Sequence, residues 1–281
     1  MVNARLVNLV GPLAILNRVQ PAILVHGHRG ARALLPENTL PAFEYAVAAG
    51  ADALEMDVAV TRDDVVVVSH DAKLNRRICT SPGCPTAIRQ LSLAELSRWD
   101  CGALRNPRFR RQTPIPRTPI PTLDEVLDLA GRGSFLFNIE IKSNPRHPEL
   151  TPPPDRFSEL VWVAVRRHRL EQRVMVQSFD FRVLNAMRRL APEIRLAALY
   201  VGRPKSLVKL GLEAGTQVIA PHHRLVRRRN VRAAHETGLQ VVAWTANQRR
   251  DWRRLAKAQV DGIITDDPAG LIAFLKERGL R

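Results

Sequence analysis

Acidic side chains lie two residues apart in an apolar run of this 281-residue chain, at Glu55 and Asp57. Residues i and i+2 of a β-strand share a face, so both carboxylates point to one side and their apolar neighbours to the other. Glu140 and Lys142 repeat this spacing in a second run. Three such carboxylates with no cysteine nearby favour a hard divalent cation, Mg²⁺ or Ca²⁺. The alternative is a buried ion pair between Glu140 and Lys142.

Two histidines and an arginine could act beside such a cation. His28 and Arg29 end an earlier strand-like run, and His70 ends the run that follows Asp57. The arginine fork matches phosphate oxygens, whereas one imidazole could take a proton from the attacking oxygen and the other could donate one to the leaving alkoxide. Trp244, which ends a later run, could form a wall of the substrate pocket. Each residue alone has an ordinary structural interpretation, so the combination carries the prediction.

Strand and helix patterns alternate along the chain, which predicts a parallel sheet. Strand-like runs cover residues 23–28, 53–60, 65–70, 135–141, 174–178, 196–201, 217–220, 240–244 and 262–265. Helix-period segments cover residues 40–49, 123–129, 157–168, 181–190, 226–236, 252–258 and 271–277. Helix N-terminal signals support several of them: we expect capping boxes at Ser92 and Thr122, and a helix cap at Asp267.

Nine strand-like runs are one too many for an eight-stranded barrel. Residues 61–64 form a link too short for a parallel crossover, so the run 65–70 must return antiparallel in a hairpin. The fold class is therefore α/β, a (β/α)8 TIM barrel with a small insertion, 72–121, after the first hairpin; a doubly wound open sheet is the alternative. We expect residues 1–22 to form an N-terminal segment and 23–281 to form the barrel.

Composition narrows the functional classes. Hydrophobic residues make up 45% of the chain and charged residues 25%, which excludes wholesale disorder, and no stretch of apolar residues is long enough for a transmembrane helix. Arginines make up 37 of the 43 basic residues behind the net charge of +16, and runs of them fall on predicted outer helices. We interpret them as a solvated face that could contact an anionic membrane peripherally, and we expect no nucleic-acid partner because no recognition motif accompanies them.

Cysteine usage and the N-terminus bear on the compartment. Cys79, Cys84 and Cys101 are too few for a disulfide framework, although they leave one bridge open. Polar residues and a proline interrupt residues 1–22, and no cleavage motif follows. We therefore expect a cytoplasmic protein; a periplasmic or secreted one is the alternative if residues 1–22 act as a leader.

The motifs, taken in order from about residue 23 to residue 275, resemble those of the glycerophosphodiester phosphodiesterase family. They are HGHRG (26–30), PENT (36–39), LEMDV with TRD (54–63), VVVVSHD (65–71), NIEIK (138–142), QSF (177–179), WTAN (244–247) and DGIITDDP (261–268). One departure is His26, which precedes the family's usual histidine by two and shares its strand face, so it could alter the site.

The resemblance implies a (β/α)8 barrel and metal-dependent hydrolysis of glycerophosphodiesters to glycerol 3-phosphate and an alcohol. It also implies residue roles, with three metal ligands, two acid/base histidines, two phosphate-binding cations and a substrate-contacting aromatic: Glu55, Asp57 and Glu140; His28 and His70; Arg29 and Lys142; and Trp244. Two alternatives remain open. One is phospholipase D-like hydrolysis of lysophospholipids or sphingomyelin, and the other is a non-enzymatic basic binding protein.

Overall fold

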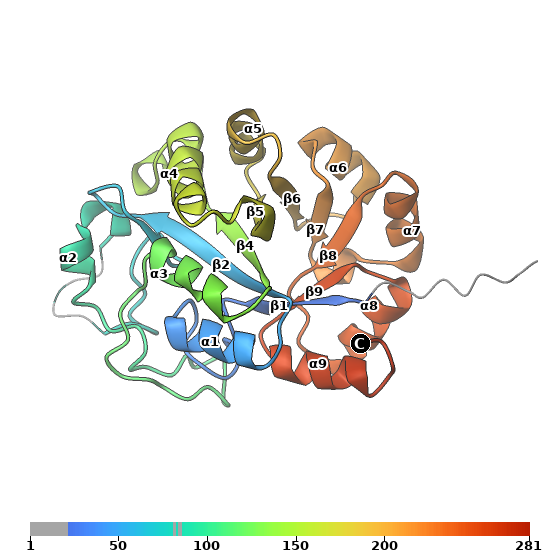
Figure 1. Ribbon diagram of the computed structural model, residues 1–281, viewed down its shortest axis with the longest axis horizontal. Coiled ribbons are helices and arrows are strands. Elements are labelled where there is room, and N and C mark those ends of the chain that lie inside the picture. Colours follow the sequence, from blue (N-terminus) through green and yellow to red (C-terminus); the bar gives the residue numbers. More distant parts are fainter. Residues whose placement is uncertain (1–21, 81–82, 84–85) are drawn as a thin grey trace, which may run out of the picture.

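A closed barrel of eight parallel strands surrounded by helices forms the body of the protein (Figure 1). The computed structural model describes residues 22–80, 83 and 86–281. The predicted N-terminal segment therefore lies outside the described residues apart from residue 22, and so does Cys84.

The strands follow the predicted runs closely. They are β1 (Leu24–His28), β2 (Ala53–Val60), β4 (Leu136–Ile141), β5 (Val174–Ser178), β6 (Arg195–Tyr200), β7 (Val218–Pro221), β8 (Gln240–Ala243) and β9 (Gly262–Thr265). The order β1-β9-β8-β7-β6-β5-β4-β2 is closed by a parallel pairing of β1 with β2. This closure confirms the TIM barrel and excludes the doubly wound open sheet.

Helices connect the strands on the outside of the barrel. The longer ones are α1 (Leu40–Ala48), α3 (Leu123–Leu127), α4 (Pro154–Arg167), α5 (Phe181–Leu190), α6 (Leu207–Ala214), α7 (Arg228–Glu236), α8 (Arg249–Ala258) and α9 (Pro268–Lys276). Asp267 caps α9 as predicted, accepting a hydrogen bond from the Gly270 backbone at 2.8 Å. Within the described part of the chain, none of the helices has the length and apolar character needed to cross a membrane.

The first hairpin and the insertion pack together at one side of the barrel (Figure 1). Strand β3 (Val66–Val68) pairs antiparallel with β2, which confirms the hairpin. The insertion contains the short helix α2 (Leu93–Leu96), and the predicted capping boxes at Ser92 and Thr122 are both present. Its small apolar cluster includes Ala59 and Val67 of the hairpin, and a disulfide joins Cys79 to Cys101.

Candidate active site

Strands β2 and β4 bring three carboxylates together inside the barrel. Their parallel register sets Asp57 directly beside Glu140, with Glu55 one inward position before it. Ligand atoms of Glu55, Asp57 and Glu140 all lie within 4.8 Å of one another. The three residues are 1%, 0% and 6% exposed. The alternation inferred from the sequence therefore places these carboxylates as expected.

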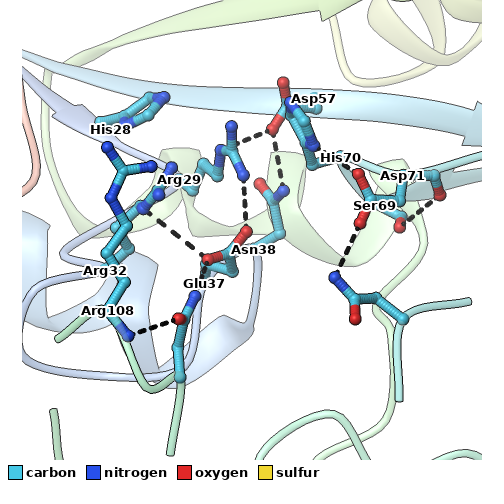
Figure 2. Close-up of polar contacts among 12 residues, drawn as sticks. His28, Arg29, Arg32, Glu37, Asn38, Asp57, Ser69, His70, Asp71 and Arg108 are labelled. Atoms are coloured by element: carbon cyan, nitrogen blue, oxygen red, sulfur yellow. Dashed lines mark hydrogen bonds and ion pairs between the residues drawn. The ribbon is translucent and has the colours of Figure 1, made fainter. Parts of the chain in front are cut away.

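Backbone and amide donors hold two of these carboxylates in place. Glu55 accepts hydrogen bonds from the Arg29 backbone N–H at 2.9 Å and from Gln177 Nε2 at 3.0 Å. Asp57 Oδ2 accepts one from Asn38 Nδ2 at 3.0 Å and lies 3.1 Å from Arg29 Nε (Figure 2). Glu55 and Asp57 are thus fixed in orientation before any ligand arrives.

The site also contains the ion pair between Glu140 and Lys142, which the sequence offered as the alternative to a cation site. Lys142 Nζ lies 2.5 Å from Glu140 Oε1 and 3.2 Å from Asp57 Oδ1. The lysine and the carboxylate cluster therefore coexist, and Lys142 reaches the cluster from one side. Asp57 and Glu140 raise the pKa of Lys142, although burial opposes them.

A divalent cation fits this cluster. Burial, followed by the charges of Asp57 and Glu140, raises the pKa of Glu55 well above its usual value. Burial also raises the pKa of Glu140, despite the opposing charge of Lys142. Asp57 Oδ1 is buried and, apart from the Lys142 ammonium at 3.2 Å, has no polar partner among the described residues. Oxygen donors that repel one another and have unused acceptor capacity suit Mg²⁺ or Ca²⁺.

The two histidines have the same arrangement around their Nδ1 atoms. His28 Nδ1 lies 2.5 Å from Asp266 Oδ1, and His70 Nδ1 lies 2.7 Å from Asp71 Oδ1. A carboxylate on one ring nitrogen fixes the orientation of the imidazole and leaves the other nitrogen free for a substrate. His28 Nε2 lies 3.9 Å from Glu55 Oε2, so its free nitrogen is next to the carboxylate cluster.

Burial decides the direction of the pKa shift of His28, whereas charged neighbours decide that of Asp266. Burial lowers the pKa of His28, and Arg29 and Arg32 lower it further against the effect of Asp266. Burial alone would raise the pKa of Asp266, but His28 and Arg32 outweigh it and lower the pKa. Asp266 is therefore ionised, and His28 stays neutral down to a lower pH than an exposed histidine does.

A strained turn after β1 places Arg29. Arg29 and Gly30 both have positive φ, at 51° and 83°. A Cβ atom on Gly30 would lie 2.6 Å from the carbonyl carbon of Ala42, so only glycine fits between this turn and α1. The turn directs the guanidinium between Glu37, 2.5 Å from Nη1, and Asp57 (Figure 2).

One cavity of about 420 Å³ unites the predicted site residues. Seven of the eight line it, and the fully buried Asp57 completes the carboxylate cluster; those seven are His28, Arg29, Glu55, His70, Glu140, Lys142 and Trp244. The Trp244 indole donates a hydrogen bond to the Ala220 carbonyl at 2.7 Å and packs edge-on against Phe179. Trp244 therefore forms part of the cavity wall.

His26 lies deeper in the barrel. It is 2% exposed, and burial, with a contribution from Arg195 and against Asp52, lowers its pKa to about 4. Its Nδ1 lies 3.4 Å from Asn138 Nδ2. It does not line the 420 Å³ cavity and is absent from the carboxylate cluster. Its presence therefore leaves the composition of the cluster unchanged.

Sequence reasoning missed several residues that shape the site. Asp266 orients His28, Gln177 holds Glu55, and Asn38 holds Asp57. All three lie within the motifs of the sequence, but Asp266 is 238 residues from His28 and Gln177 is 122 residues from Glu55, so the motifs alone do not reveal these pairings. Arg32, in the turn after β1, also lines the cavity and carried no sequence signal.

The arginine-rich helices lie away from this site. A hollow of about 840 Å³ between α7 and α8 is lined mainly by basic side chains, including Arg228, Arg250 and Arg253. Among the described residues that line it, there is no histidine or carboxylate. Its composition agrees with a solvated basic face on the outer helices.

Comparisons with known proteins point to one family. A sequence profile of the "Glycerophosphoryl diester phosphodiesterase family" matches residues 28–270. A glycerophosphodiester phosphodiesterase of Caldanaerobacter subterraneus subsp. tengcongensis is 32% identical over 256 residues, which cover 91% of this chain and 99% of the relative.

Solved structures share the fold. A crystal structure of a candidate glycerophosphoryl diester phosphodiesterase from Silicibacter pomeroyi has a TM-score of 0.85 and 34% identity, and the match covers 92% of this chain and 95% of that one. An Oleispira antarctica phosphodiesterase, solved in complex with the product sn-glycerol-3-phosphate, has a TM-score of 0.77 and 22% identity, and that match covers 91% of this chain and 97% of that one. At that identity the second likeness concerns the fold alone.

Proposed function

This chain belongs to the glycerophosphoryl diester phosphodiesterase family, and from that membership and the site geometry we propose that it hydrolyses glycerophosphodiesters to glycerol 3-phosphate and an alcohol. The observation that carries the proposal is the cluster of three buried carboxylates, within 4.8 Å of one another, beside two aspartate-oriented imidazoles. The Caldanaerobacter relative, which is named a glycerophosphodiester phosphodiesterase and is 32% identical, supports the assignment of the substrate class. A non-enzymatic binding protein would have no need of this arrangement.

The residues that would hold a divalent cation are Glu55, Asp57 and Glu140. When bound, a cation of this kind supplies positive charge that stabilises the phosphoryl oxygens in the transition state. Arg29 and Lys142 would add fixed positive charge next to the same oxygens, since both contact Asp57. Each fixed donor to such an oxyanion is worth about 3–4 kcal/mol in transition-state stabilisation.

His28 and His70 would act as the acid/base pair. Each presents its Nε2 atom because an aspartate engages its Nδ1 atom. One imidazole would take a proton from the attacking oxygen while the other protonates the leaving alcohol oxygen. Trp244 would pack against the organic part of the substrate, as its place in the cavity wall suggests.

The test uses glycerophosphocholine and an assay for released glycerol 3-phosphate. We expect activity in Mg²⁺ or Ca²⁺, loss of activity in EDTA, and loss in the Glu55→Gln variant, which removes a charged oxygen from the cluster. Glu193→Gln is the matched control, because Glu193 is exposed and lies outside the cavity. Full activity of Glu55→Gln, or in EDTA, would refute a metal role for the cluster. Release of choline from lysophosphatidylcholine but not from glycerophosphocholine would instead support the phospholipase D-like alternative.

We also propose an oxidising compartment for this protein, in place of the cytoplasmic location expected from the sequence. The disulfide between Cys79 and Cys101 supports it, because such bonds persist outside the reducing cytosol. Thiol labelling of the protein in fractionated cells tests the proposal. Free Cys79 and Cys101 thiols in a cytosolic fraction would contradict it.

A further inference from the structure

Arg32 is a buried cation with incomplete pairing. Its residue is 7% exposed, and its guanidinium lies over the Phe109 ring at 4.7 Å. The Nε atom has no hydrogen-bond partner among the described residues; its nearest carboxylates are Asp266 at 3.5 Å and Glu37 at 3.7 Å. Burial lowers the pKa of Arg32, and Arg29 and Arg108 lower it further. A buried charge of this kind is costly unless an anion pairs with it.

Two more arginines line the same cavity from opposite parts of the chain. Arg108 comes from the insertion, and Arg224 comes from the turn after β7. Both are exposed, and no described carboxylate forms an ion pair with either of them. Figure 2 shows Arg108 next to Arg32, on the side of the site where His28 lies. The cavity thus has a cationic wall that is separate from Arg29 and Lys142.

The proposed reaction centre does not need these charges. Arg29 is paired with Glu37 and Asp57, and Lys142 is paired with Glu140 and Asp57. A phosphodiester has one negative charge, and the cation that the carboxylate cluster would hold, together with Arg29 and Lys142, would bind it. Arg32 is partly paired with Asp266 and Glu37, whereas Arg108 and Arg224 face the cavity without a partner carboxylate among the described residues.

We propose that Arg32, Arg108 and Arg224 bind a second anionic group on the alcohol half of the substrate. The inference rests on the proposed function and deepens it, because it names the substrate class as glycerophosphodiesters whose alcohol carries a phosphomonoester. Arginine forks match phosphate oxygens and form charge-assisted hydrogen bonds with them. A quaternary ammonium alcohol such as choline would gain no contact from this wall, so glycerophosphocholine should be hydrolysed less efficiently than a substrate with the phosphomonoester.

The test compares two substrates that differ only by this group, glycerophosphoinositol and glycerophosphoinositol 4-phosphate. We expect kcat/KM to be at least about tenfold higher for the 4-phosphate, which is the gain from one good charged contact. Arg108→Gln and Arg224→Gln should each reduce this ratio several-fold. Both side chains are exposed, so these variants are expected to fold even if Arg32→Gln does not. Arg228→Gln is the matched control: it removes an exposed arginine outside the cavity, and the ratio should persist.

Calorimetry on the Glu55→Gln variant gives a readout that does not depend on turnover. We expect this variant to bind glycerophosphoinositol 4-phosphate more tightly than glycerophosphoinositol, and the added Arg108→Gln substitution to remove the difference. Equal binding and equal kcat/KM for the two ligands, or a ratio insensitive to Arg108 and Arg224, would overturn the inference and leave the proposed function intact. Failure to hydrolyse any glycerophosphodiester would instead refute the proposed function, and the binding comparison would still decide the inference.

Discussion

Replacing His26 with glutamine should make the stability of the protein less sensitive to acid. His26 is enclosed in the barrel, where burial lowers its pKa from 6.5 to about 4. The unfolded chain binds a proton at this residue below about pH 6.5, whereas the folded chain does so only near pH 4. Between these values the proton favours the unfolded state, so the free energy of unfolding falls as the pH falls.

The magnitude follows from the two pKa values. Each pH unit inside that window is worth about 1.4 kcal/mol. His26 should therefore reduce the free energy of unfolding by about 2 kcal/mol at pH 5 relative to pH 8, and by about 3 kcal/mol at pH 4. Glutamine carries no charge at any of these pH values and keeps an oxygen that can accept from Asn138.

Urea unfolding of both proteins at pH 8 and pH 5 measures the effect. The difference between wild type and His26→Gln should change by about 2 kcal/mol between the two pH values. All other titrating groups are common to both proteins, so their contributions cancel in this comparison. An unchanged difference would show that His26 titrates normally in the folded protein, and the reasoning from burial would be wrong.

Other variants test the supports of the site. Asp266→Asn should lower kcat by about 10²-fold or more, because His28 loses its orienting carboxylate; steady-state kinetics with unchanged circular dichroism checks this, and near-normal kcat would contradict it. Cys79→Ala should lower the free energy of unfolding by about 3 kcal/mol, and reduction of the wild-type protein should have the same effect. A melting temperature that does not change in dithiothreitol would argue against the disulfide. Gly30→Ala should destabilise more than Gly50→Ala, measured by thermal unfolding, because both have positive φ but only Gly30 is crowded; equal losses would remove the steric argument.

The barrel could be predicted because its strands are short, apolar and regular. Glu55 and Asp57 interrupt such a strand at inward positions, and the four-residue link after Val60 allowed only an antiparallel return. Helix α6 was missed because Gly211 interrupts it. In the structure Gly211 packs against Leu239, where a Cβ would lie 2.5 Å from a methyl carbon, so tertiary packing overrides its low helix propensity.

The candidate site was predicted only where its chemistry lies within single strands or motifs. Carboxylate spacing identified Glu55, Asp57 and Glu140, and strand ends identified His28 and His70. The groups that orient them depend on pairings across the barrel, such as Gln177 with Glu55. Arg32 could not have been identified from the sequence, because its role depends on its burial in the cavity wall and on the nearby charge of Arg108 in the insertion.

The contact between His28 and Asp266 has a consequence for synthesis of the protein. These residues are 238 positions apart, and β1 lies between β2 and β9 in the closed barrel. During synthesis β1 therefore leaves the ribosome long before β9 does, and one edge of β1 stays unpaired until β9 is available. Domains with such distant pairings fold slowly and expose edges that aggregate. The His28–Asp266 contact can therefore form only after β9 has been synthesised and the barrel can close. Nascent chains that end before β9 would lack this contact and would expose an unpaired edge of β1.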